Sequence, residues 1–428
     1  MNSKTSTAVS ATKSSESKPI VIYGGPLFDG SAVFNDGAVY IRDSLVAAAG
    51  DEEYVFSQIP KTVDIEVYDT LGCLITPGLI NLRSHFYRSF ATGLGFLDNS
   101  KTFWQKYEQC IDDEMVQLAV LTSILNAVKS GVTTIFDMHS SPPAILKILD
   151  NISSVISRSG IQAVLACIVT ETYGEDIFNR SVEENRRFIE TVGEPDVRGT
   201  FGVHFIQSPS ERALGVIKDV AGNSGFQIHL NHNEHLKALL DFGLVNAKSL
   251  ISSHSGFTDN DIKQIVEHGA NLVYTPETGL PPHQLTGEIK AGIGTGTHDN
   301  NLLHALRTEY DRLISAGNNQ QDALAIIETL LLANTAIAQQ FFPGKPGMLE
   351  KGVRADIAVF DYVPVTPINT DNYIQHLLLG MSQSRAKMVM TKGKFIYNDY
   401  TFLTLDDEII IEESQKAARR LFNKFEKQ

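Results

Sequence analysis

The stretch Thr76-Pro-Gly-Leu-Ile-Asn-Leu-Arg-Ser-His-Phe-Tyr-Arg-Ser-Phe90 is the most informative part of this chain. An apolar run, Cys73–Leu82, ends here in a cluster of polar and charged side chains that includes Arg83 and His85. A strand carries its last side chains to the rim of its sheet, and in barrels of alternating strands and helices that rim holds the chemistry. We therefore expect a functional site at the end of this strand.

The middle of the chain, residues 73–344, alternates between β-like and helical segments. Helical periodicity is clear in Asp113–Lys129, Ser210–Ala221, Thr258–Glu267 and Asn301–Ala316. Alternation of this kind predicts parallel strands with crossover helices, and eight rounds predict an α/β fold, a closed TIM-type (β/α)8 barrel. The strand candidates are Cys73–Leu82, Val132–Phe136, Gln162–Val169, Val197–Phe205, Phe226–Leu230, Leu250–Ser253, Asn271–Tyr274 and Ala291–Thr295.

The two ends of the chain have a different pattern. Short β-like runs fill residues 19–72 and return in residues 345–405, for instance at Ile20–Tyr23 and Lys394–Tyr397. They predict one composite β-sandwich built from both chain ends. Residues 1–18 are mostly Ser, Thr, Lys and Ala and are expected to be a disordered tail, whereas residues 406–428 are expected to form a helix.

Composition excludes some classes of function. The formal net charge of −14 argues against nucleic acid or an anionic membrane as partner, because both require local Lys/Arg excess. No stretch reaches the roughly 18 uninterrupted apolar residues of a membrane helix. The three scattered cysteines, Cys73, Cys110 and Cys167, indicate a reducing compartment. We expect a cytoplasmic homo-oligomer, such as a dimer, whose ligand is a small molecule.

The quoted stretch, together with Ala127–His139 and Gly347–Phe360, resembles the amidohydrolase superfamily. Within it, the chain looks most like the chlorohydrolase and cyclic-amidine deaminase branch, and closest to the SsnA-type aminohydrolases. The resemblance spans Ile20 to the C-terminus. It implies a metal-dependent hydrolase or deaminase of non-peptide C–N bonds, with metal ligands at the ends of strands one, five, six and eight.

The metal ligands implied by the resemblance are only partly present. Strand one of the family ends in His-x-His, but here Arg83 takes the first ligand position and His85 keeps the second. His229 matches the third imidazole ligand, on strand five. A guanidinium is a permanent cation without a lone pair to donate, so Arg83 cannot ligate a metal and would repel a dication.

The remaining family positions are also altered. His232 stands where the family carries a proton-shuttling Glu, and Glu234 could replace it only after a local shift. Ser253 stands at the strand-six His position, and the adjacent His254 is expected to face the opposite side of the strand. Gly296 stands at the strand-eight Asp that ligates metal and accepts a proton, and Asp299 follows three residues later.

Further residues match substrate-contact positions. His204 matches a strand-four His that contacts substrate, and Asp137 with His139 matches the acidic-His pair that ends strand two. With Arg83, His204 and His139 are the predicted ligand-binding residues. Each also has an ordinary interpretation, because His85, His229 and His204 could be buried, hydrogen-bonded residues with no ligand.

Three functional hypotheses follow from this pattern. The first is a pseudoenzyme without a cofactor, which has lost ligand, shuttle and catalytic Asp together. The second is an active C–N hydrolase with a rearranged zinc or iron site, whose candidate ligands are His232, His235, His254, His298 and Asp299. The third is a metal-free protein that binds a small anion at Arg83 through bidentate hydrogen bonds.

Overall fold

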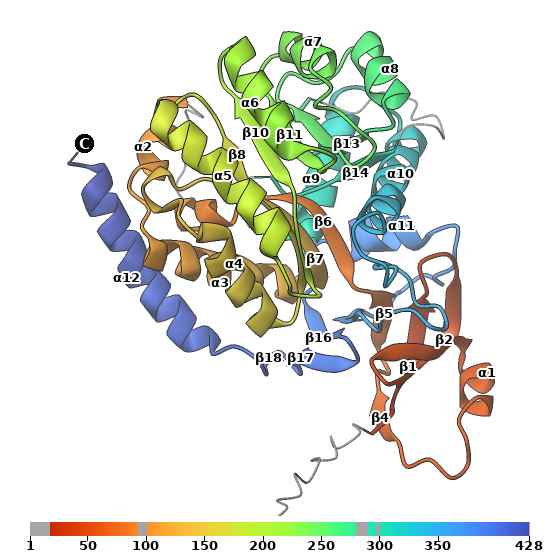
Figure 1. Ribbon diagram of the computed structural model, residues 1–428. Helices are drawn as coiled ribbons and strands as arrows, with labels where there is room; N and C mark the ends of the chain where they lie inside the picture. Colours follow the sequence, from red (N-terminus) through yellow and green to blue (C-terminus); the bar gives the residue numbers. More distant parts are fainter. Residues whose placement is uncertain (1–17, 93–100, 280–289, 297–299, 428) are drawn as a thin grey trace, which may run out of the picture.

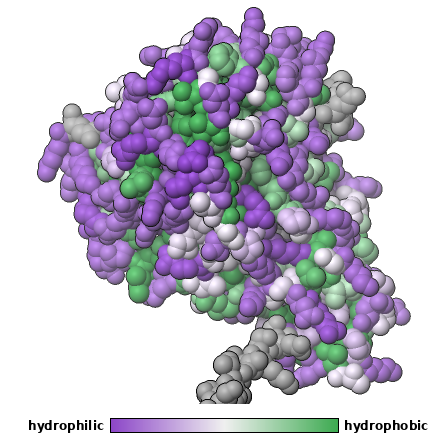
Figure 2. All heavy atoms as spheres, viewed as in Figure 1, coloured by the Kyte–Doolittle hydropathy of each residue, from purple (hydrophilic) through white to green (hydrophobic). Residues whose placement is uncertain are grey.

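A computed structural model describes residues 18–92, 101–279, 290–296 and 300–427 of the chain. It contains a large barrel, a separate small sheet beside the barrel, and a long helix along the barrel's flank (Figure 1). Hydrophilic residues predominate on the face drawn in Figure 2, and hydrophobic residues appear there in smaller groups between them.

The barrel is formed by eight parallel strands, each hydrogen-bonded to the next in chain order. The ring closes where Ser84 bridges Gly296, and the Gly296 N–H donates to the Arg83 carbonyl at 3.0 Å. The predicted (β/α)8 barrel is therefore confirmed. Its strands are β6 (Leu79–Ser84), β7 (Val132–His139), β8 (Gln162–Val169), β10 (Phe201–Phe205), β11 (Phe226–Leu230), β12 (Leu250–Ser253), β13 (Asn271–Tyr274) and β14 (Ala291–Ile293), and the short β9 (Val197–Gly199) pairs with β8.

Helices surround the barrel and begin where the sequence provides caps. At Thr258, the side chain accepts from the Asp261 N–H while the Asp261 carboxylate accepts from the Thr258 N–H, a reciprocal cap at the predicted helix start. The outer helices are α3 (Asp113–Lys129), α4 (Ile148–Ser159), α5 (Glu175–Thr191), α6 (Glu211–Ala221), α7 (Glu234–Asp241), α8 (Asp259–Glu267), α9 (Leu302–Ser315) and α10 (Gln320–Ala338).

Helix α10 is the one described helix long and apolar enough, by length and composition, to cross a membrane. Its apolar face packs against β14 and β6 in the barrel wall. Asn334 binds both strands: its side-chain N–H groups donate to the carbonyls of Ile80 (2.7 Å) and Ile293 (2.8 Å). Packing against the barrel thus accounts for the buried apolar residues of this helix, among them Ile326, Ile327 and Leu330.

The small sheet combines both chain ends, as predicted. Its central contact joins β5 to β15, which run antiparallel from Cys73–Asp361 to Pro77–Ile357. Residues from both ends, including Ile22, Val39, Ile357 and Met390, share one buried cluster. The strands are β1 (Ile20–Phe28), β2 (Val33–Arg42), β3 (Leu45–Asp51), β4 (Glu66–Asp69), β5 (Cys73–Pro77), β15 (Ile357–Asp361), β16 (Ala386–Thr391), β17 (Lys394–Asn398) and β18 (Thr401–Phe402), with helix α1 (Glu52–Ser57) beside them.

The single strand predicted over Cys73–Leu82 is instead two strands in different sheets. Strand β5 ends at Pro77 in the small sheet, and β6 begins at Leu79 in the barrel. Between them, Gly78 lies so close to Thr133 that a side chain would collide with it, and its N–H donates to the Asp356 carbonyl at 2.9 Å. The Pro77-Gly78 pair inside the run is a local signal of this break, but it does not show the change of sheet, because both strands are buried.

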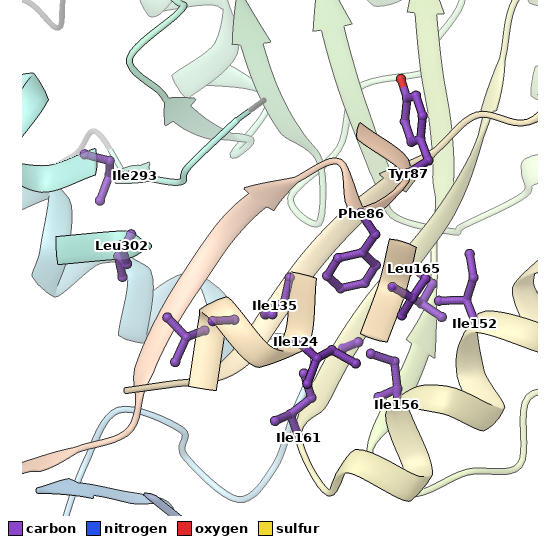
Figure 3. Packing of buried hydrophobic residues seen from close by; sticks show 14 of the residues in the cluster. Phe86, Tyr87, Ile124, Ile135, Ile152, Ile156, Ile161, Leu165, Ile293 and Leu302 are labelled. Carbon is purple, nitrogen blue, oxygen red and sulfur yellow. The ribbon is translucent and has the colours of Figure 1, made fainter. Parts of the chain in front are cut away.

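The segment after β6 anchors the barrel rim to the outer core. In the 3-10 helix η1 (Phe86–Ala91), Phe86 is fully buried in the same cluster as Ile124, Ile135 and Leu165, as Figure 3 shows. Helix α2 (Lys101–Glu108) follows, and the predicted C-terminal helix is α12 (Asp407–Phe425), which packs on α3 and α2. The short helices α11 (Tyr373–Gln375), η2 (Pro142–Ala144) and η3 (His376–Gly380) complete the described elements.

Candidate functional site

A cavity of about 190 Å³ opens at the carboxyl ends of the barrel strands, where the chemistry of this fold resides. Its wall combines histidines with basic, acidic and aromatic side chains. The residues that line it include Arg83, His85, His204, His229, His232, His254, Arg88, Trp104, Glu108, Tyr173 and Glu277.

Arg83 faces the interior because β6 changes register before its end. Ile80 and Leu82 belong to the cluster that fills the barrel, which would turn Arg83 outward by simple alternation. The pairing of β6 with β7 shifts between Asn81 and Ser84. A one-residue shift exchanges the faces of a strand, so Arg83 and His85 both turn inward beyond it.

The Arg83 guanidinium is held by uncharged partners. Nη1 donates to the Ser252 hydroxyl oxygen at 2.7 Å and contacts the Met138 sulfur at 3.4 Å. Nη2 lies 3.2 Å from Nε2 of His85. Burial lowers the pKa of Arg83 to about 10, while the Glu277 carboxylate opposes that shift, so the side chain stays a cation at neutral pH.

His85 is a neutral imidazole with a defined tautomer. Its Nδ1 lies 2.8 Å from the Met138 carbonyl, which can only accept, so Nδ1 carries the proton. Nε2 therefore has the lone pair and accepts from Arg83. Burial, with the nearby charges of Arg88 and Arg83, holds the pKa of His85 well below its usual value.

His229 is linked to the same guanidinium through Ser252. Its Nδ1 lies 3.1 Å from the Ser252 oxygen, and the Ser252 hydroxyl donates to the Ile228 carbonyl at 3.2 Å. Burial and the charge of Arg83 keep the pKa of His229 well below its usual value. His204, on the neighbouring strand, places its ring centroid 4.9 Å from that of His229. The structure thus brings Arg83, His85, His204 and His229 together.

The outer wall of the cavity comes from η1 and α2 and was not predicted. Arg88 stacks its guanidinium 4.1 Å above the Trp104 ring, and its Nε donates to the Tyr87 hydroxyl at 2.9 Å. The buried Glu108 carboxylate accepts from the hydroxyls of Tyr87 (2.9 Å) and Tyr173 (2.7 Å). Arg88 lies in the motif that directed attention to this strand, and that signal could have identified it.

Glu277 is a further site residue that sequence reasoning missed. It follows the end of β13 by three residues and lines the cavity. The Thr275 hydroxyl donates to its Oε2 at 3.1 Å. Its place just beyond strand seven of an expected barrel was the available signal, because strand ends face the site.

Ser253 does not face the cavity, contrary to its predicted ligand position. Its hydroxyl donates to the Asn233 side-chain oxygen at 2.6 Å. Along β12, Leu250 belongs to the barrel interior and Ile251 to the outer cluster, so the inward residue is Ser252. By the same alternation His254 turns inward, and it does line the cavity. The two neighbours therefore face opposite sides, as expected, but His254 rather than Ser253 is the one that faces the cavity.

His139 and Asp137 lie in the barrel wall rather than at the cavity surface. They alternate with Met138, whose sulfur contacts Arg83. Asp137 Oδ1 accepts from the Phe86 N–H at 2.7 Å, and burial raises the pKa of Asp137 to about 8. His139 Nε2 lies 2.8 Å from the Ser141 hydroxyl, and burial lowers its pKa to about 3. The predicted ligand contact by His139 is not supported by this placement.

The candidate ligands of a rearranged metal site do not converge. His232 is exposed at the cavity, His235 is buried with Nε2 3.4 Å from the Ser208 hydroxyl, and Glu234 is exposed in the first turn of α7. Within the described parts of the chain, no group of three or more His, Cys, Asp or Glu side chains could hold a metal ion. His298 and Asp299 lie outside the described residues.

These residues do not fit a hydrolytic metal centre. Such a centre needs several N or O ligands converging on one ion, together with an open position for water. Here a guanidinium lies between the two residual imidazoles: it donates to His85 directly and reaches His229 through Ser252. Gly296 adds no side chain at the strand-eight position and adopts a left-handed φ of 62°.

Sequence comparison finds deaminases among the proteins similar to this chain. The chain is 24% identical over 420 residues to a 5'-deoxyadenosine deaminase of Methanosarcina mazei, covering 90% of this chain and 93% of the relative. It is 24% identical over 406 residues to a 5-methylthioadenosine/S-adenosylhomocysteine deaminase of Thermococcus onnurineus, covering 87% and 93% of the two chains.

Solved structures share the fold. A zinc-bound adenosine deaminase from Xanthomonas campestris superimposes with a TM-score of 0.79 at 17% identity, covering 94% of this chain and 98% of that one. An atrazine chlorohydrolase from Arthrobacter aurescens, complexed with zinc, gives a TM-score of 0.75 at 18% identity over 93% and 100% of the chains. The amidohydrolase family model matches residues 74–396. Because that match spans about three quarters of the chain, the protein belongs to the amidohydrolase family.

Proposed function

We propose that this protein is a pseudoenzyme of the amidohydrolase family, which binds a small molecule in the barrel cavity without metal-dependent C–N hydrolysis. The observation that carries this proposal is the position of the Arg83 guanidinium, bonded to Ser252 and to His85 Nε2. The nitrogen lone pair that His85 would offer to a metal is engaged by a permanent cation.

The chemistry of metal-assisted hydrolysis explains why this matters. A metal ion lowers the pKa of bound water and polarises the substrate. A guanidinium has hydrogen-bond donors but no empty coordination site, so it cannot activate water in that way. It would also repel a dication brought to the same place, because the two charges would lie within a few ångströms of each other. The cavity keeps the groups that bind a ligand and loses those that activate water.

Binding remains well supported by the cavity wall. Trp104 offers an aromatic surface, while Arg88, His204 and His232 add hydrogen-bonding groups around it. Pockets with an apolar surface and a few convergent polar groups are the usual small-molecule sites. We therefore place the ligand between helix α2 and the strand ends.

A small anion is a second candidate ligand, and Arg88 is the observation that favours it. Its guanidinium lines the cavity, yet the nearest Glu108 oxygen is 3.7 Å away, which is beyond a normal hydrogen bond. Arg83 was the predicted anion contact. Because Arg83 already donates to Ser252 from Nη1 and to His85 from Nη2, we now favour Arg88 for that role.

Trp104 makes this proposal testable, because it is the chain's only tryptophan and it lines the cavity. Titrations should follow its fluorescence with adenosine, 5'-deoxyadenosine, small carboxylates and phosphate. We expect a saturable change with at least one of them, weakened about tenfold or more by Arg88→Ala, which removes a charged contact. Arg307→Ala on the exposed face of α9 is the matched control and should bind normally.

The same preparations should be assayed for ammonia release, with and without added zinc. We expect no release above that of a His85→Ala His229→Ala variant. Turnover that depends on both imidazoles would contradict the proposal and support a rearranged hydrolytic site. If no compound in the series changes the fluorescence, the nucleoside and anion assignments fail.

A further inference from the structure

Gly296 and Glu277 share one small volume next to Arg83. A side-chain Cβ at residue 296 would stand 2.7 Å from the Glu277 carboxyl carbon and 2.9 Å from Oε1, and it would be nearer still to Oε2. These separations are shorter than van der Waals contact, so the Glu277 carboxylate fills the space that a side chain at 296 would take. The volume that a side chain at residue 296 would occupy is thus filled by the carboxylate of Glu277, which follows strand seven.

The surrounding structure fixes that carboxylate at the cavity floor. The Thr275 hydroxyl at the end of β13 donates to Glu277 Oε2. On the other side, the Gly296 N–H donates to the Arg83 carbonyl, and Gly296 bridges Ser84. Glu277 therefore lies beside the backbone contact between residues 83 and 296 that closes the barrel.

We propose that Glu277 supplies, from strand seven, the carboxylate that the family resemblance places on strand eight, so that it fills the volume of the missing strand-eight side chain at the cavity. This assignment goes beyond the proposed function, since it concerns which strand provides the site's carboxylate and holds whether or not a ligand is bound.

The first experiment tests the shared volume without any metal. Gly296→Ala should lower the melting temperature more than Gly243→Ala does. Gly243 is a matched control with a similar φ of 70°, but a side chain there would meet nothing within 4 Å. Adding Glu277→Ala to Gly296→Ala should recover part of the loss, because the crowding carboxylate is gone. Equal losses at the two glycines, without recovery, would overturn the shared-volume argument.

The second experiment tests the position of the carboxylate. Arg83→His removes the cation and places an imidazole beside His85, His229 and Glu277, a three-nitrogen, one-oxygen set that suits zinc or cobalt. We expect this variant to bind close to one equivalent of Co²⁺, with the visible absorption of a ligated ion. Glu277→Gln in the Arg83→His background should weaken binding by tenfold or more. Glu234→Gln in that background, on an exposed helix start, should not.

Circular dichroism spectra establish that each variant is folded before binding is compared. A folded Arg83→His protein that binds no cobalt, or binding that Glu277→Gln leaves unchanged, would overturn the assignment of Glu277. Neither outcome depends on turnover or on the natural ligand. Failure of the proposed function, seen as hydrolysis or absent ligand binding, is therefore distinguishable from failure of this assignment.

Discussion

The two ends of the barrel hold their arginines in opposite ways. At the end facing the small sheet, Arg354 donates to Asp356 at 2.7 Å and pairs with Asp196, which also pairs with Lys392. At the cavity end, Arg83 has only neutral hydrogen-bond partners apart from the nearby charge of Glu277. The first arrangement joins the small sheet to the barrel, whereas the second holds a cation at the inner end of the cavity without a hydrogen-bonded carboxylate.

This difference distinguishes charged groups that stabilise the fold from charged groups that belong to the functional site. In this fold, the end away from the active site stabilises the protein and the opposite end carries chemistry. A cation enclosed by carboxylates has little left to offer a ligand. A cation held by a serine, a sulfur and a neutral imidazole remains electrostatically strong, because low polarity around it does not screen its charge.

The largest effect should follow from breaking the structural end. Arg354→Ala would leave Asp356 and Asp196 buried with less compensation, and loss of one partner of a buried ion pair costs about 3–5 kcal/mol. Urea denaturation should show that loss, while the native Trp104 emission stays unchanged, because the cavity lies at the other end. A cost below about 1 kcal/mol would mean that the network is not structural.

A smaller effect should appear as a pH dependence of the free energy of unfolding, caused by Asp137 in the barrel wall between the two ends. Burial raises the pKa of Asp137 to about 8, above the unfolded value of about 3.9. The folded protein therefore binds this proton more tightly, so the stabilisation is complete below the unfolded pKa and is lost as pH rises toward 8.

Asp137→Asn should flatten this dependence, which has a limiting slope of about 1.4 kcal/mol per pH unit. The buried Glu309, whose pKa is raised to about 7, also titrates between pH 7 and pH 8, but it contributes equally to the natural protein and to Asp137→Asn. The difference between the two proteins in denaturation over that window therefore isolates Asp137, because His85, His139 and His229 have lowered pKa values and stay neutral. If the variant and the natural protein lose stability equally between these two pH values, Asp137 is not the group responsible.

The smallest effect should be electrostatic and local to the cavity. Arg83→Met removes a charge that lowers the pKa of both His85 and His229, so both pKa values should rise. NMR titration of the histidine ring protons measures this directly. Unchanged values at His85 and His229 would show that Arg83 does not act on them.

The fold could be predicted from sequence because alternation and caps are local signals. The barrel strands and the Thr258 helix start needed no long-range information. The Pro77-Gly78 pair marks a break between the two strands, but the change of sheet does not follow from it, because two buried strands in succession look like one. The contact of Gly78 with Thr133, which is distant in sequence, appears only in the structure.

The positions of site residues could be predicted only where the strand that carries the residue determines its position. Arg83, His85, His204 and His229 lie together in the structure. Ser253 was assigned to the strand-six position from the family resemblance, and β12 has only four residues, too few for its own pattern to show that Ser252 turns inward. Glu277 is identified by its close approach to Gly296. A contact between neighbouring strands cannot be recognised from the sequence of either segment alone.

The metal content of the purified natural protein, expressed with and without added zinc and iron and then dialysed, tests the replacement of the metal by Arg83 most directly. We expect metal well below one equivalent under every condition, because Arg83 occupies the lone pair of His85 and carries the positive charge of the site. Near-stoichiometric metal that resists dialysis, and is lost in a His85→Ala His229→Ala variant, would contradict it.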